Sequence, residues 1–543
     1  MSIQTKPIHA ATAAVVSAVL SLSINAASLS PEHLRVHVDG GVVEGTAGTK
    51  PGIRVFKGIP YAAPPVGTLR WKEPQPVVKW SGVRMADHFG PRCMQAPIYS
   101  DMIFRDTGNR EDCLQLNVWT PAKSPSDRLP VMLWIHGGGF QAGASSEPRQ
   151  DGEVLATKGV IIVSINYRMG IFGFYAHPDL TKESAHHASG NYGLLDQAQA
   201  LKWVHHNIKA FGGDPAKVTV FGESAGSFSV SALMASPTSR DLIAGAIGES
   251  GAFFGPTLAA MSLADGEVQG VKFASTQSAD LAGLRAIPAD KLLEAAKVKG
   301  VGFNPIIDGY FFPESPAAIF ASGKQSHVPL LAGWNSDEMP YMVLMSKDKP
   351  TPEKLAAQFH DKYPAEANTL TAAYAASNDQ EAMQAARELS SDQFIGYSTW
   401  KWIDTQARTG EKPVYRYSFS RVRPSKPGAM MGPIKASELG AVHASEIEYV
   451  FGALDSNKTF DWQPDDYKVS ELMQTYWTNF AKTGDPNGPG VPKWGTYSGH
   501  DDGRQVMHLD VGAHSAPETH RDRYEALDKA YAAAAPASAS ASK

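Results

Sequence analysis

Residues 218–226 read VTVFGESAG, an apolar β-branched run followed at once by the pattern Gly-x-Ser-x-Gly. The run 218–221 is typical of a buried strand, and residues 227–235 are compatible with a helix. Small residues beside Ser224 allow the sharp strand-to-helix turn that holds a nucleophilic serine away from the backbone. The sequence therefore predicts a serine nucleophile on a strand–turn–helix unit. The alternative is a glycine-bracketed turn whose serine has no chemical role.

Further strand patterns lie on both sides of this unit, at 131–135, 160–165, 328–332 and 414–419. Strands that are apolar throughout suit a sheet covered on both faces. Residues 194–208, between two of these runs, place apolar side chains near helical spacing. This alternation predicts an α/β fold, with a mostly parallel central sheet flanked by helices. Residues 339–410 are expected to form a helical insertion over the active site.

A glycine-rich motif, HGGGF at residues 136–140, directly follows the predicted strand 131–135. Backbone N–H groups in such a loop can point at a developing oxyanion without obstruction from side chains. A dinucleotide-binding loop is the competing interpretation, but its Gly-x-Gly-x-x-Gly pattern needs a third glycine where Ala142 stands. We therefore interpret the motif as an oxyanion-binding loop.

The composition excludes two classes of protein. The 543 residues are 43% hydrophobic and 19% charged, which is typical of a globular chain and not of a disordered one. The 50 Lys and Arg residues against 55 Asp and Glu residues give no basic surplus, so we expect no nucleic-acid partner. The oligomeric state is left unassigned.

The N-terminus has the pattern of a secretory signal peptide, because Lys6 precedes an apolar run at 11–24 that ends in small residues. We expect residues 1–27 to be that peptide, 28–531 to form one catalytic domain, and 532–543 to be a disordered Ala/Ser tail. The apolar run is too short to cross a bilayer, and no second one follows. The prediction is a secreted or periplasmic protein without an integral membrane segment; the alternative for the N-terminus is a disordered apolar segment.

The only two cysteines are Cys93 and Cys113. If the chain is exported they can form one disulfide, which would stabilise the fold by roughly 3 kcal/mol through loop entropy. The alternative is two free thiols.

The sequence from Val42 to Leu509 resembles the type-B carboxylesterases, the α/β-hydrolase family that includes cholinesterases and bacterial secreted esterases. The resemblance rests on the two glycine motifs and on the blocks 56–62, 65–67, 69–71, 111–118, 166–168, 190–197, 211–215 and 479–487. It implies a carboxylic-ester hydrolase that uses Ser224 and, later in the chain, an acid and a histidine.

Two adjacent carboxylates, Asp337 and Glu338, compete for the role of the acid after the predicted strand 328–332. The resemblance implies Glu338, the second of the pair. Where the family usually has Gly after this Glu, the chain has Met339, which lines the pocket or merely packs. The resemblance also implies His443 as the base, whereas His136 is expected only to shape the glycine loop.

The mechanism implied by this family begins when His443 takes the proton of Ser224, which attacks the ester carbonyl. The N–H groups of Gly138, Gly139 and Ala225 would hold the oxyanion. No metal or organic cofactor is needed, and the partner is a small-molecule ester. Since an unperturbed imidazole has a pKa of about 6.5, activity should rise through roughly pH 6–7.

The substrate is less constrained. Residues 98–110 lack the Trp with which cholinesterases bind choline, so a cation–π site is poorly supported. Thr257 occupies the position that matches a Trp of the acyl pocket in cholinesterases. This difference suggests a larger acyl pocket, part of which Phe253 or Phe254 fills. Two other functions remain as alternatives: a non-catalytic cholinesterase-like binding protein, and an amidase with the same triad.

Overall fold

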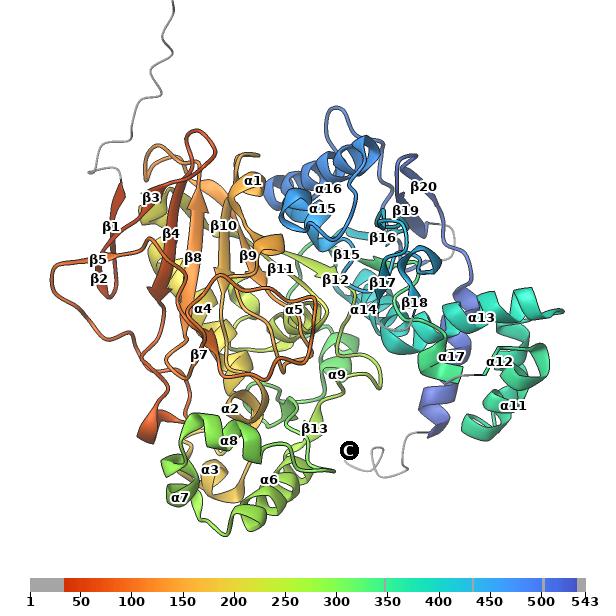
Figure 1. Cartoon of the computed structure of the whole chain (residues 1–543), viewed down its shortest axis with the longest axis horizontal. Coiled ribbons are helices and arrows are strands. Elements are labelled where there is room, and N and C mark those ends of the chain that lie inside the picture. The colour runs from red at the N-terminus through yellow and green to blue at the C-terminus, as the bar shows by residue number, and fades with distance from the viewer. Residues whose placement is uncertain (1–33, 346–347, 432–433, 501–502, 535–543) are drawn as a thin grey trace, which may run out of the picture.

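The structure is a computed structural model that describes residues 34–345, 348–431, 434–500 and 503–534. The predicted signal peptide, residues 1–27, lies outside the described residues, as do residues 535–543 of the predicted tail. Figure 1 shows a large sheet with helices on both of its faces and a group of smaller helices at one end of the molecule.

Among the described residues, the central sheet has eleven strands, and seven successive strands, from β19 to β10, pair in parallel. Its order is β20 (His514–Pro517), β19 (Gln505–Leu509), β16 (Val414–Phe419), β15 (Leu330–Asn335), β12 (Gly245–Glu249), β11 (Gly213–Glu223), β9 (Leu129–Ile135), β10 (Ile161–Ile165), β8 (Gln115–Thr120), β4 (Arg54–Pro60) and β3 (Thr46–Ala47). The outer strands pair antiparallel. The predicted α/β class and mostly parallel sheet are confirmed.

A small three-stranded sheet lies outside this sheet and consists of β1 (Arg35–Val38), β2 (Gly41–Glu44) and β5 (Val83–Met85). The small strand pairs are β6 (Arg92–Cys93) with β7 (Asn109–Arg110), β13 (Met261–Ser262) with β14 (Ile306–Ile307), and β17 (Met430–Met431) with β18 (Ile434–Lys435). The α-helices before β15 are α1 (Glu153–Ala156), α2 (Gly170–Phe174), α3 (Pro178–Glu183), α4 (Tyr192–Asn207), α5 (Ala225–Ala235), α6 (Leu263–Gln277), α7 (Leu281–Ala286), α8 (Ala289–Ala295) and α9 (Pro316–Ala321).

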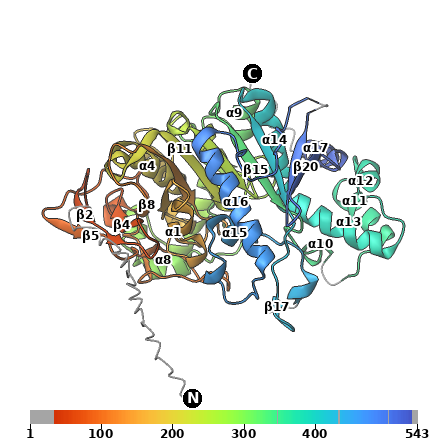
Figure 2. The ribbon, with the colours of Figure 1, turned by 90° about the horizontal axis from the view of Figure 1, so that it is seen from above.

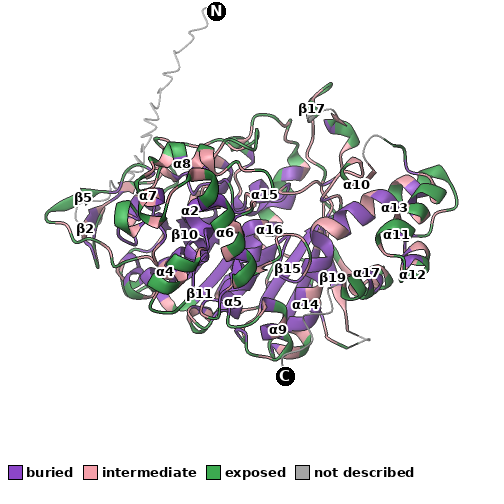
Figure 3. Cartoon of the chain, turned by 90° about the horizontal axis from the view of Figure 1, so that it is seen from below, coloured by how far each residue is buried: buried purple, intermediate pink, exposed green. Residues whose placement is uncertain are grey.

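Strand β9 shows why these sequences form a sheet with two covered faces. Successive side chains of a strand point to opposite faces. Val131, Leu133 and Ile135 accordingly pack in a core with α4 and α5. Met132 and Trp134 pack in a second core with α15 (Ile447–Phe451) and α16 (Pro464–Thr483). Figure 2 shows α16 crossing the sheet, and Figure 3 shows the buried strands between outer helices.

The predicted helical insertion falls on helices. Between β15 and β16 lie α10 (Met342–Met345), α11 (Pro352–Lys362), α12 (Ala367–Ala373), α13 (Asp379–Ser391) and α14 (Tyr397–Thr409). A single π-helical turn, Asp392–Gly396, joins α13 to α14. Helix α14 packs against β15 as part of the layer that covers the sheet, whereas α11 and α12 lie beside α17 (Arg521–Ala534) at one end of the molecule (Figure 1).

The C-terminal boundary needs a correction. The sequence predicts a disordered tail from residue 532, but residues 532–534 form the last turn of α17. Alanine has the highest helix propensity of the amino acids, so an alanine run continues a helix that has already started. Among the described residues, no helix is both long and apolar enough to cross a membrane.

Candidate active site

Ser224 lies on the sharp turn between β11 and α5, with φ 54° and ψ −124°. A serine in this left-handed region stores strain, and the surrounding packing maintains it. The glycines of the motif allow the packing: a Cβ on Gly226 would lie 2.0 Å from the carbonyl oxygen of Ile135, and one on Gly222 would lie 2.6 Å from the backbone of Gly226. The turn therefore presents Ser224 directly at the carboxyl ends of β11 and β9.

The glycine loop that follows β9 lies against this turn. A Cβ on Gly137 would be 3.0 Å from Cβ of Ser224, so the two backbones are in close contact. Gly138 and Gly139 have φ of +103° and +61°, conformations that side chains rarely allow. Gly138, Gly139 and Ala225, the predicted oxyanion donors, are thus all carried by the two segments that meet at Ser224.

His136 has the structural role expected of it. Its ring is buried, stacks on Tyr167 with centroids 4.5 Å apart, and has Nδ1 2.9 Å from the carbonyl oxygen of Gly137. Burial lowers the pKa of His136 to about 4, so the ring is neutral at physiological pH. It shapes the glycine loop as an uncharged core residue.

His443 and Glu338 come together although they are far apart in the chain. Nδ1 of His443 lies 2.6 Å from Oε2 of Glu338, a carboxylate that is 1% exposed at the end of β15. The other oxygen, Oε1, accepts hydrogen bonds from the backbone N–H of Asn335 at 2.7 Å and from Oγ of Ser250 at 2.5 Å. Asp337 instead accepts from Ser336 Oγ and lines a separate cavity. The structure therefore pairs His443 with Glu338.

A second carboxylate faces the other side of the imidazole. Oε1 of Glu223 is 3.2 Å from Nε2 of His443, without the geometry of a hydrogen bond. Burial alone would lower the pKa of His443, but the charges of Glu223 and Glu338 outweigh burial and raise this pKa to about 9. Burial also raises the pKa of Glu223 above its ordinary value, and the nearby Glu446 adds to this rise. This pKa lies above the unperturbed value of about 6.5, on which the expected rise of activity through roughly pH 6–7 was based.

Several residues near the site have no clear signal in the sequence. Phe394, on the π-helical turn, places its ring 5.0 Å from that of His443 at an interplanar angle of 80°. Single π-helical turns are frequent at functional sites, but no periodicity in the sequence marks this one. Glu446 accepts a hydrogen bond of 2.6 Å from the side chain of Asn335 and is fully buried. The one signal in the sequence that Glu446 lies near the site is its position three residues after His443.

The predicted disulfide is present between Cys93 and Cys113. The loop that it closes reaches the glycine motif: Tyr99 Oη and Met102 Cε would each lie 3.2 Å from a Cβ added to Gly139 or Gly138, respectively. This loop therefore forms part of the wall beside the predicted oxyanion site.

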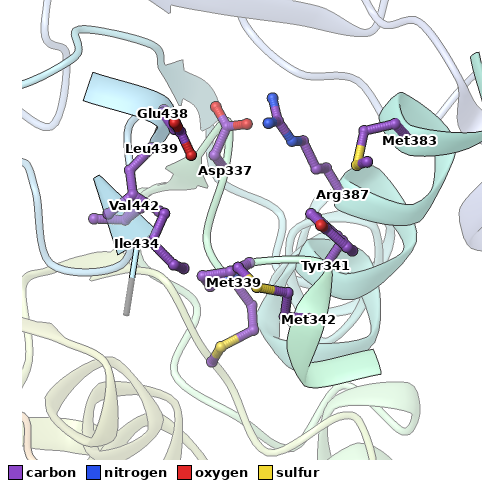
Figure 4. Close-up of a pocket in the computed structure, with 12 residues that line it drawn as sticks. Asp337, Met339, Tyr341, Met342, Met383, Arg387, Ile434, Glu438, Leu439 and Val442 are labelled. Atoms are coloured by element: carbon purple, nitrogen blue, oxygen red, sulfur yellow. The ribbon is translucent and has the colours of Figure 1, made fainter. Parts of the chain in front are cut away.

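The predicted substrate-pocket residues have different surroundings in the structure. Phe253 and Phe254 line an apolar groove of about 420 Å³ together with Tyr397. Thr257 donates a hydrogen bond to the carbonyl oxygen of Gln393, on the π-helical turn. Met339 lines a different cavity of about 320 Å³, drawn in Figure 4. Within the described ranges, no three His, Cys, Asp or Glu side chains are arranged to hold a metal ion.

The comparisons with known proteins agree over most of the chain. The sequence profile described as "Carboxylesterase family" matches residues 32–527. Para-nitrobenzyl esterase of Bacillus subtilis is 36% identical over 88% of this chain and 95% of its own, and fumonisin B1 esterase of Sphingopyxis macrogoltabida is 36% identical over 83% and 82%. A solved structure of PNB esterase superimposes with a TM-score of 0.77 at 35% identity, and covers 91% of this chain and 99% of its own.

Proposed function

The chain belongs to the carboxylesterase family and is a carboxylic-ester hydrolase, and from this premise we propose that Ser224, His443 and Glu338 are its catalytic triad. The observation that carries the proposal is the hydrogen bond of 2.6 Å between Nδ1 of His443 and one carboxylate oxygen of Glu338. The other oxygen of this carboxylate accepts a hydrogen bond from Ser250. A carboxylate fixed in this way orients the imidazole with Nδ1 protonated, which leaves Nε2 as the base.

The reaction proceeds in two halves. His443 takes the hydroxyl proton of Ser224, and the serine oxygen bonds to the ester carbonyl carbon. The resulting oxyanion accepts hydrogen bonds from the N–H groups of Gly138, Gly139 and Ala225. When the intermediate collapses, the carbon–alkoxy bond breaks and His443 gives its proton to the departing alcohol. Water then attacks the acyl-enzyme by the same route and releases the acid and the free serine.

The strained turn supports the assignment of Ser224 as the nucleophile. Its position at the N-terminus of α5 favours the negative charge that develops during attack. The glycine loop in close contact with its Cβ provides small residues where the oxyanion must form. The neighbouring Glu223 would stabilise the imidazolium that forms after proton transfer.

The test compares the wild-type protein with Ser224→Ala on 4-nitrophenyl esters from acetate to octanoate. We expect the variant to lose several orders of magnitude of kcat/KM, since triad members act as a unit. Equal hydrolysis by both proteins would contradict the assignment. The matched control is Ser239→Ala, because Ser239 is a buried serine whose side chain donates a hydrogen bond to the carbonyl oxygen of Leu233.

We also propose that the protein is exported, with residues 1–27 removed as a signal peptide. The disulfide supports this proposal because such bonds persist in oxidising compartments. Expression of the full chain in a bacterial host, followed by N-terminal sequencing of the periplasmic and extracellular fractions, should find a start near residue 28. A full-length N-terminus in the cytoplasm alone would contradict export.

A further inference from the structure

A cavity of about 320 Å³ is built by the same two loops that carry the proposed acid and base. Met339 follows Glu338, Val442 precedes His443, and both line the cavity. Most of the remaining wall is apolar and flexible, with contributions from Met342, Met383, Ile434 and Leu439 (Figure 4). Methionine side chains adapt to irregular apolar groups, so this wall suits an apolar spacer better than one rigid ring.

Three charged side chains line the cavity: Asp337, Glu438 and Arg387. Glu438 has Lys435 Nζ 3.8 Å away, and Asp337 accepts a hydrogen bond of 2.7 Å from Ser336. Arg387, on α13, is half-buried and makes no hydrogen bond or ion pair with any residue that the structure describes. Figure 4 shows its side chain extending from the helix alongside Asp337. The guanidinium is thus the cavity's one charge without a protein partner in the described parts of the chain.

A guanidinium is always charged and presents N–H donors in a planar fork that matches a carboxylate. A half-buried guanidinium without a partner has given up part of its hydration, so a ligand that pairs with it gains more than at an open surface. Asp337 and Glu438 oppose any excess of negative charge on the ligand, which favours a monoanion over a phosphate dianion.

We propose that this cavity is a substrate subsite, and that the preferred substrates are esters bearing a second, free carboxylate that pairs with Arg387. The apolar spacer between the ester and this carboxylate lies along the side chains of Met339, Met342 and Met383. The inference rests on the proposed function of Ser224, His443 and Glu338, and adds the substrate class to it.

The experiment uses two matched ester pairs, each with one anionic and one neutral member. Mono-4-nitrophenyl adipate against 4-nitrophenyl heptanoate places the carboxylate on the acyl side. 4-Acetoxybenzoate against 4-methylphenyl acetate places it on the alcohol side. The quantity measured is the ratio of kcat/KM for the anionic ester to that for the neutral ester, compared between the wild-type protein and its variants. The two esters of a pair differ in intrinsic reactivity, but this difference is the same for every protein. It therefore cancels when the ratios of two proteins are compared.

In Arg387→Gln we expect this ratio to fall about tenfold for one pair, the scale of a lost hydrogen bond to a charged group. Arg387→Lys keeps the charge but not the fork, so its ratio should be intermediate. Asp337→Asn should raise the ratio, because it removes the neighbouring negative charge. Lys362→Gln removes an exposed positive charge from α11 and is the control for long-range electrostatics, with no change in the ratio.

An unchanged ratio in Arg387→Gln for both pairs overturns the inference. The same holds if Lys362→Gln lowers the ratio as much as Arg387→Gln does. These outcomes are distinguishable from failure of the proposed function, because Ser224→Ala tests that function on the neutral esters alone. If Ser224→Ala loses hydrolysis of the neutral esters but Arg387→Gln does not change the ratio, the proposed triad is supported and the proposed subsite is contradicted.

Discussion

Ser250 donates a hydrogen bond of 2.5 Å to Oε1 of Glu338, the carboxylate whose other oxygen lies 2.6 Å from His443. Ser250 directly follows β12 and has φ +60°, a conformation that a serine adopts only under the constraint of its surroundings. Both oxygens of the proposed catalytic acid are therefore fixed from the protein interior, and the strained serine is one of the groups that fix them.

Ser250→Ala should lower kcat/KM about tenfold and leave KM nearly unchanged. The substitution removes one of the two hydrogen bonds to Oε1 of Glu338 and leaves the bond from the backbone N–H of Asn335, a loss on the order of 1–3 kcal/mol at a group that does not touch the substrate. Steady-state kinetics on 4-nitrophenyl butyrate measure this change, and Ser239→Ala is the control for removing a buried hydroxyl elsewhere. Equal kinetics for the two variants would show that Ser250 does not position Glu338.

Glu223→Gln should shift the acid limb of the pH profile of kcat/KM toward lower pH, by about one unit. The charges of Glu223 and Glu338 raise the pKa of His443 to about 9, and the neutral imidazole is the base. Activity in the wild-type protein is therefore expected to rise as the pH increases toward 9, and removing one carboxylate lets the imidazole deprotonate earlier.

The control for this pH experiment is Glu249→Gln. Glu249 is also a fully buried glutamate, but its carboxylate accepts a hydrogen bond of 2.7 Å from Trp477 Nε1 instead of contacting His443. Its limb should coincide with that of the wild-type protein. An unchanged limb in Glu223→Gln would refute the electrostatic coupling between Glu223 and His443.

Phe394→Ala should reduce kcat/KM about two- to tenfold, the range expected for losing an edge-to-face ring contact. The ring covers one side of His443, so its removal admits water beside the base. Phe394→Tyr keeps the ring and should recover most of the rate. Thermal denaturation of both variants identifies any global loss of stability. If alanine and tyrosine give the same rate at equal stability, the ring has no part in the site.

Gly226→Ala should destabilise the protein by about 1–3 kcal/mol or more and abolish hydrolysis, because the added methyl would overpack a filled space. That methyl would lie 2.0 Å from the backbone oxygen of Ile135, so either β9 or the Ser224 turn has to move. Gly512→Ala is the control, since a Cβ there meets nothing within 4 Å. Thermal denaturation and the ester assay together measure the effect, and a variant equal to Gly512→Ala in both would contradict the prediction.

Much of the fold could be predicted from local patterns. The apolar runs at 131–135 and 414–419 correspond to β9 and β16, and the predicted helix at 194–208 corresponds to α4 within two residues at each end. A strand that is buried on both faces has a continuous apolar run, and a helix that is buried on one face has apolar residues at helical spacing. Both patterns can be recognised in the sequence without knowing which segments pack against them. The strand–turn–helix unit around Ser224 was predictable for the same reason.

The sequence did not determine the features that depend on contacts between distant segments. Phe253 and Phe254 line one groove and Met339 lines another cavity, because loops after different strands decide which space each side chain reaches. The pKa of His443 could not be read from its own sequence block either, since two carboxylates from β11 and β15 set it.

The sequence by itself determined the α/β class, the strained serine turn and, through family resemblance, a match to carboxylesterases over most of the chain. Only the tertiary structure decided that Ser250, 88 residues from Glu338 in the sequence, donates a hydrogen bond to this carboxylate. The tertiary structure also places the ring of Phe394 against His443. It further places Arg387 at a cavity, where the guanidinium has no partner among the described residues. The physical reason is that strand and helix periods record which faces are buried, whereas the partners of each side chain depend on how separately encoded loops pack together.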